Sequence, residues 1–137
     1  MGRILAIDYG SKRSGIAVTD ESKIIASGLT TVATSQLQQW IEDYVKEEEV
    51  ETLIIGEPKR MHGVASDIET FIKPFIVKLK QVLPYLKIER IDERFTSKMA
   101  FDMLLQSGAS KKKRKDKKLI DQISATIILQ DYLNYKK

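Results

Sequence analysis

Arg3-Ile4-Leu5-Ala6-Ile7-Asp8-Tyr9-Gly10-Ser11-Lys12-Arg13-Ser14-Gly15-Ile16-Ala17-Val18-Thr19-Asp20 is the stretch that decides the fold. Residues 4–7 form an unbroken apolar run, which is typical of a strand buried on both faces at the centre of a sheet. Asp8 ends that run, and Gly15 opens a second strand-like run over residues 16–19. A carboxylate at the exit of a central strand is costly unless it meets a cation or a polar partner. Asp8 therefore has two possible roles: it caps a turn, or it faces a metal ion or a phosphate. The other motifs of the chain favour one role over the other.

Length and composition predict one ordinary globular domain over residues 1–137, with a single core. Apolar residues make up 42% of the chain and charged residues 31%. The sequence has neither a long apolar span nor a secretory signal, so we expect a cytoplasmic protein that does not bind membranes. The lack of cysteine excludes thiol catalysis, and the single histidine excludes a histidine cluster for zinc. Any metal ion should be a hard ion held by carboxylates, which means Mg²⁺ or Mn²⁺.

The net charge of +4 comes from one local segment. Residues 111–118 hold seven of the 23 basic side chains against Asp116 alone, which gives this segment +6. The remaining 16 basic and 18 acidic residues carry −2. A local basic patch favours a polyanionic partner such as nucleic acid, although a solvated lysine-rich loop is the alternative.

Hydrophobic periodicity predicts an α/β fold with a five-stranded mixed sheet flanked by helices. The expected strands are residues 4–7, 16–19, 24–32, 53–55 and 86–91, and the expected helices lie within residues 35–45, 68–83, 96–108 and 118–135. The first three strands should form an antiparallel meander, and the other two should extend the sheet in parallel. Gly28 predicts a bulge, Ser35 and Gln38 have the spacing of a capping box, and Pro74 predicts a kink in a continuing helix.

Carboxylates follow three of the predicted strands. Asp8, Glu57 and the adjacent pair Asp92-Glu93 stand where the parallel strands end, at the edge where α/β folds place their ligands. Asp121 is expected in the first turn of the final helix, where it either interacts with the helix dipole or joins the cluster as a further metal ligand. Clustered carboxylates need divalent cations in order to be ionised together. Two such ions about 4 Å apart activate a water and stabilise the leaving oxygen of a phosphodiester.

Four motifs, in order, resemble those of the YqgF family, whose members are also called Holliday-junction-resolvase-like proteins or pre-16S rRNA nucleases. The motifs are Ile7-Asp8-Tyr9-Gly10-Ser11-Lys12 with Gly15-Ile16-Ala17, Ile55-Gly56-Glu57-Pro58, Asp92-Glu93-Arg94-Phe95-Thr96, and Asp121-Gln122-Ile123-Ser124-Ala125. The resemblance covers essentially the full chain. It implies a ribonuclease H-like fold, a bacterial cytoplasmic protein, and a role in trimming the 5′ end of the 16S ribosomal RNA precursor during ribosome biogenesis.

The resemblance also implies that Asp8, Glu93 and Asp121 are the catalytic carboxylates. Strand alternation independently favours Glu93 over Asp92, because Glu93 shares a face with Ile91 whereas Asp92 points to the other face. The predicted metal ligands are thus Asp8, Glu93 and Asp121.

The sequence departs from the family pattern in two places. Glu57 stands where many members have leucine, and it is either a further metal ligand or a residue at the rim of the site. The stretch Arg60-Met61-His62-Gly63 stands where Asn-Met-Asp-Gly is common, and we expect His62 to be a loop residue without a catalytic role. The predicted nucleic-acid-binding residues are Lys12, Arg13, Lys59, Arg60, Arg94, Lys111, Lys112, Lys113, Arg114 and Lys115.

Three functions are compatible with these motifs. The first is a metal-dependent nuclease, a phosphodiester hydrolase that acts on structured RNA in a pre-ribosomal particle or, alternatively, on branched DNA as a Holliday junction resolvase-like enzyme. The second is a non-catalytic nucleic-acid-binding factor in ribosome assembly. The third is an actin-like ATPase, because Asp-x-Gly followed by a glycine hairpin also occurs there. Those ATPases bind nucleotide between two such domains and this chain supplies one, so we rank the nuclease first and the ATPase last.

Overall fold

A computed structural model describes residues 2–57, 67–92 and 117–135. The elements, in chain order, are β1 (Arg3–Asp8), β2 (Arg13–Thr19), β3 (Ala26–Ala33), a 3₁₀ turn (Thr34–Gln36), α1 (Leu37–Glu47), β4 (Val50–Glu57), α2 (Glu69–Val82), β5 (Lys87–Asp92) and α5 (Lys117–Tyr135). The helix predicted within residues 96–108 lies outside the described residues.

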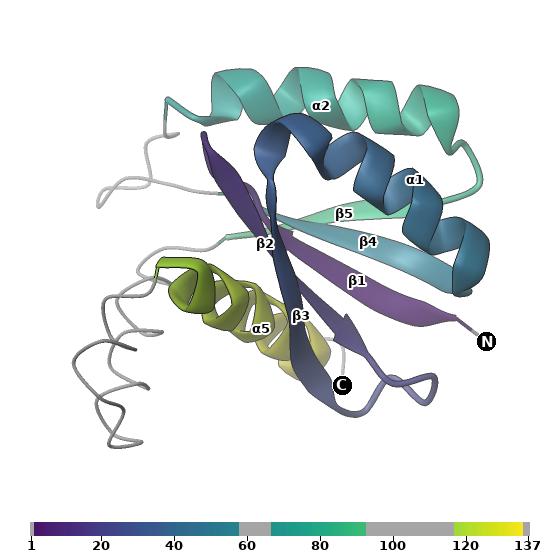
Figure 1. Cartoon of the computed structure of the whole chain (residues 1–137). Coiled ribbons are helices and arrows are strands. Elements are labelled where there is room, and N and C mark those ends of the chain that lie inside the picture. The colour runs from purple at the N-terminus through teal and green to yellow at the C-terminus, as the bar shows by residue number, and fades with distance from the viewer. Residues whose placement is uncertain (1, 58–66, 93–116, 136–137) are drawn as a thin grey trace.

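The strands form one five-stranded sheet in the order β3-β2-β1-β4-β5 (Figure 1). β1 pairs antiparallel with β2, and β2 pairs antiparallel with β3. β4 pairs parallel with β1, and β5 pairs parallel with β4. Short turns suffice for the antiparallel part, whereas α1 and α2 return the chain to the start of each parallel strand. The predicted mixed sheet, with its antiparallel meander and two further parallel strands, is confirmed.

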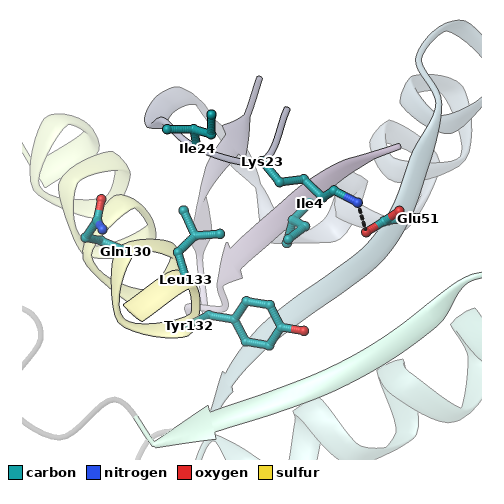
Figure 2. A pocket seen from close by; sticks show the side chains of 7 residues that line it. All are labelled: Ile4, Lys23, Ile24, Glu51, Gln130, Tyr132 and Leu133. Atoms are coloured by element: carbon teal, nitrogen blue, oxygen red, sulfur yellow. Dashed lines mark hydrogen bonds and ion pairs between the residues drawn. The ribbon is translucent and has the colours of Figure 1, made fainter. Parts of the chain in front are cut away.

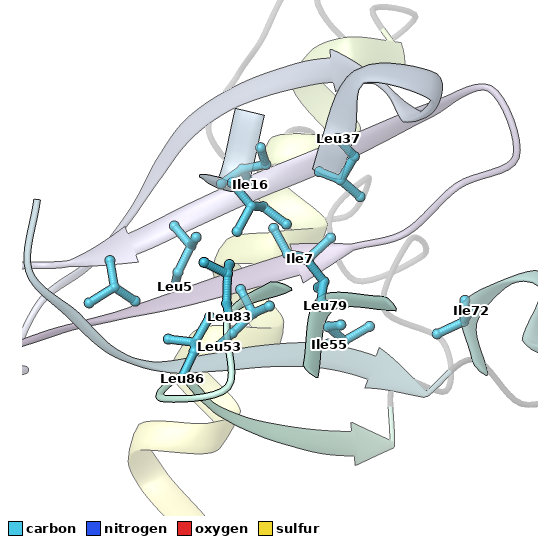
Figure 3. Packing of buried hydrophobic residues seen from close by; sticks show 12 residues of the cluster. Leu5, Ile7, Ile16, Leu37, Leu53, Ile55, Ile72, Leu79, Leu83 and Leu86 are labelled. Carbon is cyan, nitrogen blue, oxygen red and sulfur yellow. The ribbon is translucent and has the colours of Figure 1, made fainter. Parts of the chain in front are cut away.

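Helices cover both faces of this sheet, with α1 and α2 on one side and α5 on the other (Figure 1). Alternation along β1 sends Leu5 and Ile7 into the cluster beneath α1 and α2 (Figure 3). Ile4 and Ala6 point the other way and pack against α5. A strand buried on both faces must be apolar throughout, which explains the unbroken run at the start of the chain.

The third strand contains a bulge beside Gly28, as predicted. Ile16 pairs with Thr30 and Ala17 pairs with Gly28, so Leu29 is an extra residue in β3.

The predicted capping box of Ser35 and Gln38 is wrong. The 3₁₀ turn precedes α1, which begins at Leu37, and no side chain caps either helix start. Thr34 instead makes a tertiary contact, because its hydroxyl donates a hydrogen bond to the carbonyl oxygen of Gly10 at 2.7 Å. The contact with the β1–β2 loop, and not the local capping pattern, accounts for how the chain enters this helix.

The other two helices match their predicted ranges closely. α2 runs through Pro74 without a break, as the phase of its apolar residues predicted. α5 begins at Lys117, so Asp121 lies in its second turn and not in the first turn as predicted. An interaction with the helix dipole, which is confined to the first turn, therefore does not account for Asp121. No helix in the described part of the chain is long and apolar enough to cross a membrane.

A buried ion pair joins β5 to α2. The guanidinium of Arg90 binds both carboxylate oxygens of Glu69, whose side chain is only 5% exposed. The same guanidinium donates to the carbonyl oxygens of Ile55 and Gly56 at 3.0 and 2.9 Å. Arg90 thus anchors the last residues of the β4 backbone just before Glu57, at the edge where the parallel strands end.

Candidate active site

Three strands end on a carboxylate at one edge of the sheet. Asp8 is the last residue of β1, Glu57 of β4, and Asp92 of β5. The parallel registers bring these ends level, because Ile7 pairs with Ile55 and Glu57 pairs with Asp92. The described part of the predicted carboxylate edge is therefore present.

The three carboxylates do not share one face of the sheet. Ala6 packs against α5, so alternation places Asp8 on the α5 face. Ile55 packs beneath α1 and α2, so alternation places Glu57 on the opposite face, together with its register partner Asp92. The structure therefore groups Glu57 with Asp92 and separates both from Asp8.

A close contact between α5 and β2 brings Asp121 to the face of Asp8. Gly15 is the register partner of Asp8 across the β1–β2 ladder. A Cβ atom built on Gly15 would lie 2.0 Å from the carbonyl oxygen of Asp121, so the helix backbone rests directly on the strand. Only glycine leaves room for this approach. Asp8 and Asp121, from opposite ends of the sequence, thereby become neighbours.

Asp121 has a cationic partner that sequence reasoning assigned only to nucleic-acid binding. Arg13 Nε donates a hydrogen bond to Asp121 Oδ2 at 2.7 Å, with the two side chains 32% and 23% exposed. Both residues line a hollow of about 330 Å³, together with Gly10, Ser11 and Lys12. The predicted cations Lys12 and Arg13 therefore lie beside one of the predicted catalytic carboxylates.

The hydroxyl groups of Ser14 and Thr34 hold the loop that forms this hollow. Thr34 Oγ1 donates to the Gly10 carbonyl oxygen and lies 2.8 Å from Ser14 Oγ, so the Ser14 hydroxyl donates to Thr34. Ser14 Oγ in turn accepts from the Gly10 amide at 3.3 Å, and the Thr34 amide donates to the Lys12 carbonyl oxygen at 3.0 Å. This network, which sequence reasoning missed, fixes the backbone from which Lys12 and Arg13 extend.

Tyr9 directly follows Asp8 and points to the other face of the sheet. Its ring packs against Phe75 of α2 with the centroids 5.3 Å apart. Burial raises the pKa of the Tyr9 phenol. Tyr9 therefore stays neutral at physiological pH and adds no negative charge beside Asp8.

A second hollow, of about 370 Å³, lies at the opposite end of the sheet (Figure 2). It is lined by Ile4, Lys23, Ile24, Glu51, Gln130, Tyr132 and Leu133. Lys23 forms an ion pair with Glu51 at 2.9 Å, and the Tyr132 hydroxyl donates to Glu89. Burial, reinforced by that bond, raises the pKa of Tyr132, so its phenol stays protonated. Among the residues that the structure describes, no predicted site residue lines this hollow.

The donors at the carboxylate edge fit a hard divalent cation. Within residues 2–57, 67–92 and 117–135, no three or more acidic, histidine or cysteine side chains converge as a metal site. Asp8 and Asp121 nevertheless supply two carboxylates on one face, and the Arg13 guanidinium shows that a positive charge is accommodated against Asp121. Oxygen donors of this kind suit Mg²⁺ or Mn²⁺.

Several predicted residues lie outside the described ranges, and their roles stay predictions. They are Lys59, Arg60, His62, Glu93, Arg94, Lys111, Lys112, Lys113, Arg114 and Lys115.

Comparison with known proteins gives a match over nearly the whole chain. The model of the family described as "RuvX: Holliday junction resolvase" matches residues 2–135. A protein of Flavobacterium johnsoniae named "Putative pre-16S rRNA nuclease" is 56% identical over 137 residues, which is 100% of this chain and 99% of the relative. Proteins with the same name from Porphyromonas gingivalis and Bacteroides fragilis are 54% and 53% identical, over 98% and 100% of this chain and 97% and 99% of their own lengths.

The contact at Gly15 generates a test of how the site is assembled. Gly15→Ala should lower the free energy of unfolding by about 2 kcal/mol, because the new methyl group forces α5 away from β2. Gly28→Ala is a matched control, since its Cβ would meet α5 at 3.3 Å from Thr126 Oγ1 and needs only a small adjustment. Urea unfolding of the two variants measures the difference, and equal losses would show that the Gly15 contact is not tight.

Proposed function

This chain belongs to the RuvX family, which is the YqgF family that its motifs resemble. We propose that it is a metal-dependent nuclease that processes the 5′ end of pre-16S rRNA in ribosome biogenesis. The family has a ribonuclease H-like fold, so the five-stranded mixed sheet of this chain belongs to the predicted fold class. The relatives' name supports RNA as the substrate, and we place the reaction in the cytoplasm, on RNA of the pre-ribosomal particle. The family's description supports branched DNA as the second candidate substrate.

The observation that carries the proposal is the pairing of Asp8 with Gly15 beneath the backbone of Asp121. It puts a carboxylate from β1 and a carboxylate from α5 on the same face, next to a hollow lined by Lys12 and Arg13. We propose that Asp8 and Asp121 hold Mg²⁺ or Mn²⁺ and that the two cationic side chains bind the phosphate backbone. When bound, a pair of such metal ions would supply activation of the attacking water and stabilisation of the leaving oxygen.

We propose Glu93 as the third carboxylate. Ile91 packs in the cluster on the α5 face, whereas Arg90 binds α2 on the other face. Alternation places Asp92 on the face of Arg90 and therefore away from Asp8, which supports the choice of Glu93 made from the sequence. The same alternation removes Glu57 from the proposed ligand set, because Glu57 is the register partner of Asp92.

Asparagine substitutions test the two described carboxylates. Asp8→Asn and Asp121→Asn should each lower metal-dependent cleavage by about a thousandfold, since each removes a charged ligand. The fold should hold, because asparagine keeps the size of each side chain, and the ion pair that Asp121 loses is partly exposed to solvent. Asp131→Asn, on the same helix and with the same change in charge, is the control. Cleavage is measured on precursor rRNA and on four-way DNA junctions.

Each result of this comparison bears on one function. Faster cleavage of the junction than of the precursor would favour the resolvase. Metal-independent binding without cleavage of either substrate would instead indicate a non-catalytic assembly factor. Undiminished cleavage by folded Asp8→Asn protein would refute the proposed site.

The choice between neighbouring carboxylates has its own test. Glu93→Gln should lower cleavage by orders of magnitude and weaken metal binding. Asp92→Asn should instead lower the free energy of unfolding by about 1 kcal/mol, as when a hydrogen bond is removed, and leave metal binding intact. Titration of both variants with Mn²⁺ decides between them, and the reverse ranking would identify Asp92 as the ligand.

The basic segment is tested through salt dependence. Replacing Lys111, Lys112, Lys113 and Arg114 with alanine should weaken binding to RNA of any sequence. The replacement should also make the binding constant for a duplex less dependent on salt. The slope of its logarithm against the logarithm of the salt concentration should become shallower by about 0.9 unit for each phosphate that the protein no longer neutralises. The control removes four exposed lysines, Lys46, Lys73, Lys78 and Lys80, from α1 and α2, the helices on the far face from α5. Equal slopes for the two quadruple variants would show that residues 111–114 are merely solvated.

A further inference from the structure

We propose that Arg13 is a positioning residue for Asp121, and that its N–H···O bond to that carboxylate raises the affinity of the site for a divalent cation. This inference rests on the proposed function, in which Asp121 is a metal ligand. The bond joins Arg13 Nε to Asp121 Oδ2 at 2.7 Å. Arg13 would then have two roles, which are the predicted contact with nucleic acid and the orientation of the Asp121 carboxylate.

One strand holds Asp121 at two points. Arg13, Gly15 and Ala17 alternate onto the α5 face of β2, where Ala17 packs against the helix. Gly15 receives the main chain of Asp121, and Arg13, two residues earlier, binds its side chain. The backbone contact fixes where the residue lies, but the carboxylate can still rotate about its side-chain bonds. The Arg13 bond restricts that rotation.

Arg13 is itself held in place. It pairs with Ala33 at the start of the β2–β3 ladder, and the neighbouring loop is fixed by the hydroxyl groups of Ser14 and Thr34. The donor is Nε, the guanidinium nitrogen nearest the backbone, so few rotatable bonds separate the contact from the strand. A hydrogen bond from an anchored donor keeps a ligating carboxylate in one orientation, and removing such a partner weakens metal affinity.

Charge alone predicts the opposite effect. A guanidinium beside a metal ligand repels the incoming cation, so removing it would tighten metal binding if Arg13 only balanced the charge of Asp121. Both side chains are about a quarter to a third exposed, at 23% and 32%, so solvent screens this repulsion. The test must therefore separate the hydrogen bond from the charge.

Two uncharged variants of equal length make that separation. In Arg13→Gln the side-chain Nε2 occupies the same position along the side chain as the arginine Nε and can still donate to Asp121. Arg13→Met has the same length without a donor. Because both variants lack the charge, any difference between them comes from the hydrogen bond. We expect the Kd for Mn²⁺, measured by calorimetry on the full chain without nucleic acid, to be about tenfold higher for Met than for Gln.

Two further variants make the result decisive. Lys23→Met breaks an ion pair at the opposite end of the sheet, and it should leave the Mn²⁺ affinity unchanged. Asp121→Asn tests the underlying ligand assignment, because retention of Mn²⁺ at the wild-type affinity would refute the proposed function itself. If Asp121→Asn loses Mn²⁺ but the Gln and Met variants bind it equally, or Met binds it more tightly, only the role of Arg13 is overturned.

Discussion

The close approach of α5 to the middle of the sheet is the constraint on which the site depends. It requires small side chains in the middle of this face of β1 and β2, and the chain supplies Ala6, Gly15 and Ala17 there. On the opposite face the same strands carry large side chains, including Ile7 and Ile16, beneath two helices. The two faces of the sheet thus have different roles. The face beneath α1 and α2 holds most of the large buried side chains, and the other face brings α5 close to Asp8.

The carboxylates at the edge of the sheet lie on different faces, and each face also carries an arginine. The negative groups at the strand ends are divided between the two faces, which lowers their mutual repulsion. On one face Arg90 neutralises Glu69 and ties down the backbone of β4. On the other face Arg13 lies against Asp121, beside a hollow that opens to solvent. The buried pair has a structural role, whereas the more exposed pair lies in the site that we propose for a metal ion and the substrate phosphate.

The sheet was largely predictable because strand patterns are local. Unbroken apolar runs identified the buried strands, and Gly28 marked the bulge in β3. Features that depend on tertiary contacts were not predictable in the same way. The capping pattern at Ser35 failed because the chain before α1 is bound to a distant loop, and the turn that contains Asp121 could not be placed without the true start of α5. The bond between Arg13 and Asp121 joins residues whose proximity only the packed helix reveals.

The position of Asp121 on the last described helix has a consequence for the order of folding. Asp8 belongs to the first strand, so the two carboxylates meet only when segments from opposite ends of the sequence pack together. Contacts between such distant segments are slow to form, because the long loop between them must be closed at a cost in entropy. A chain in which α5 is not docked would have the sheet edge and Arg13 but would lack the carboxylate of Asp121. In the proposed function, docking of α5 therefore completes the metal site, and a chain in which this helix is undocked would not cleave nucleic acid.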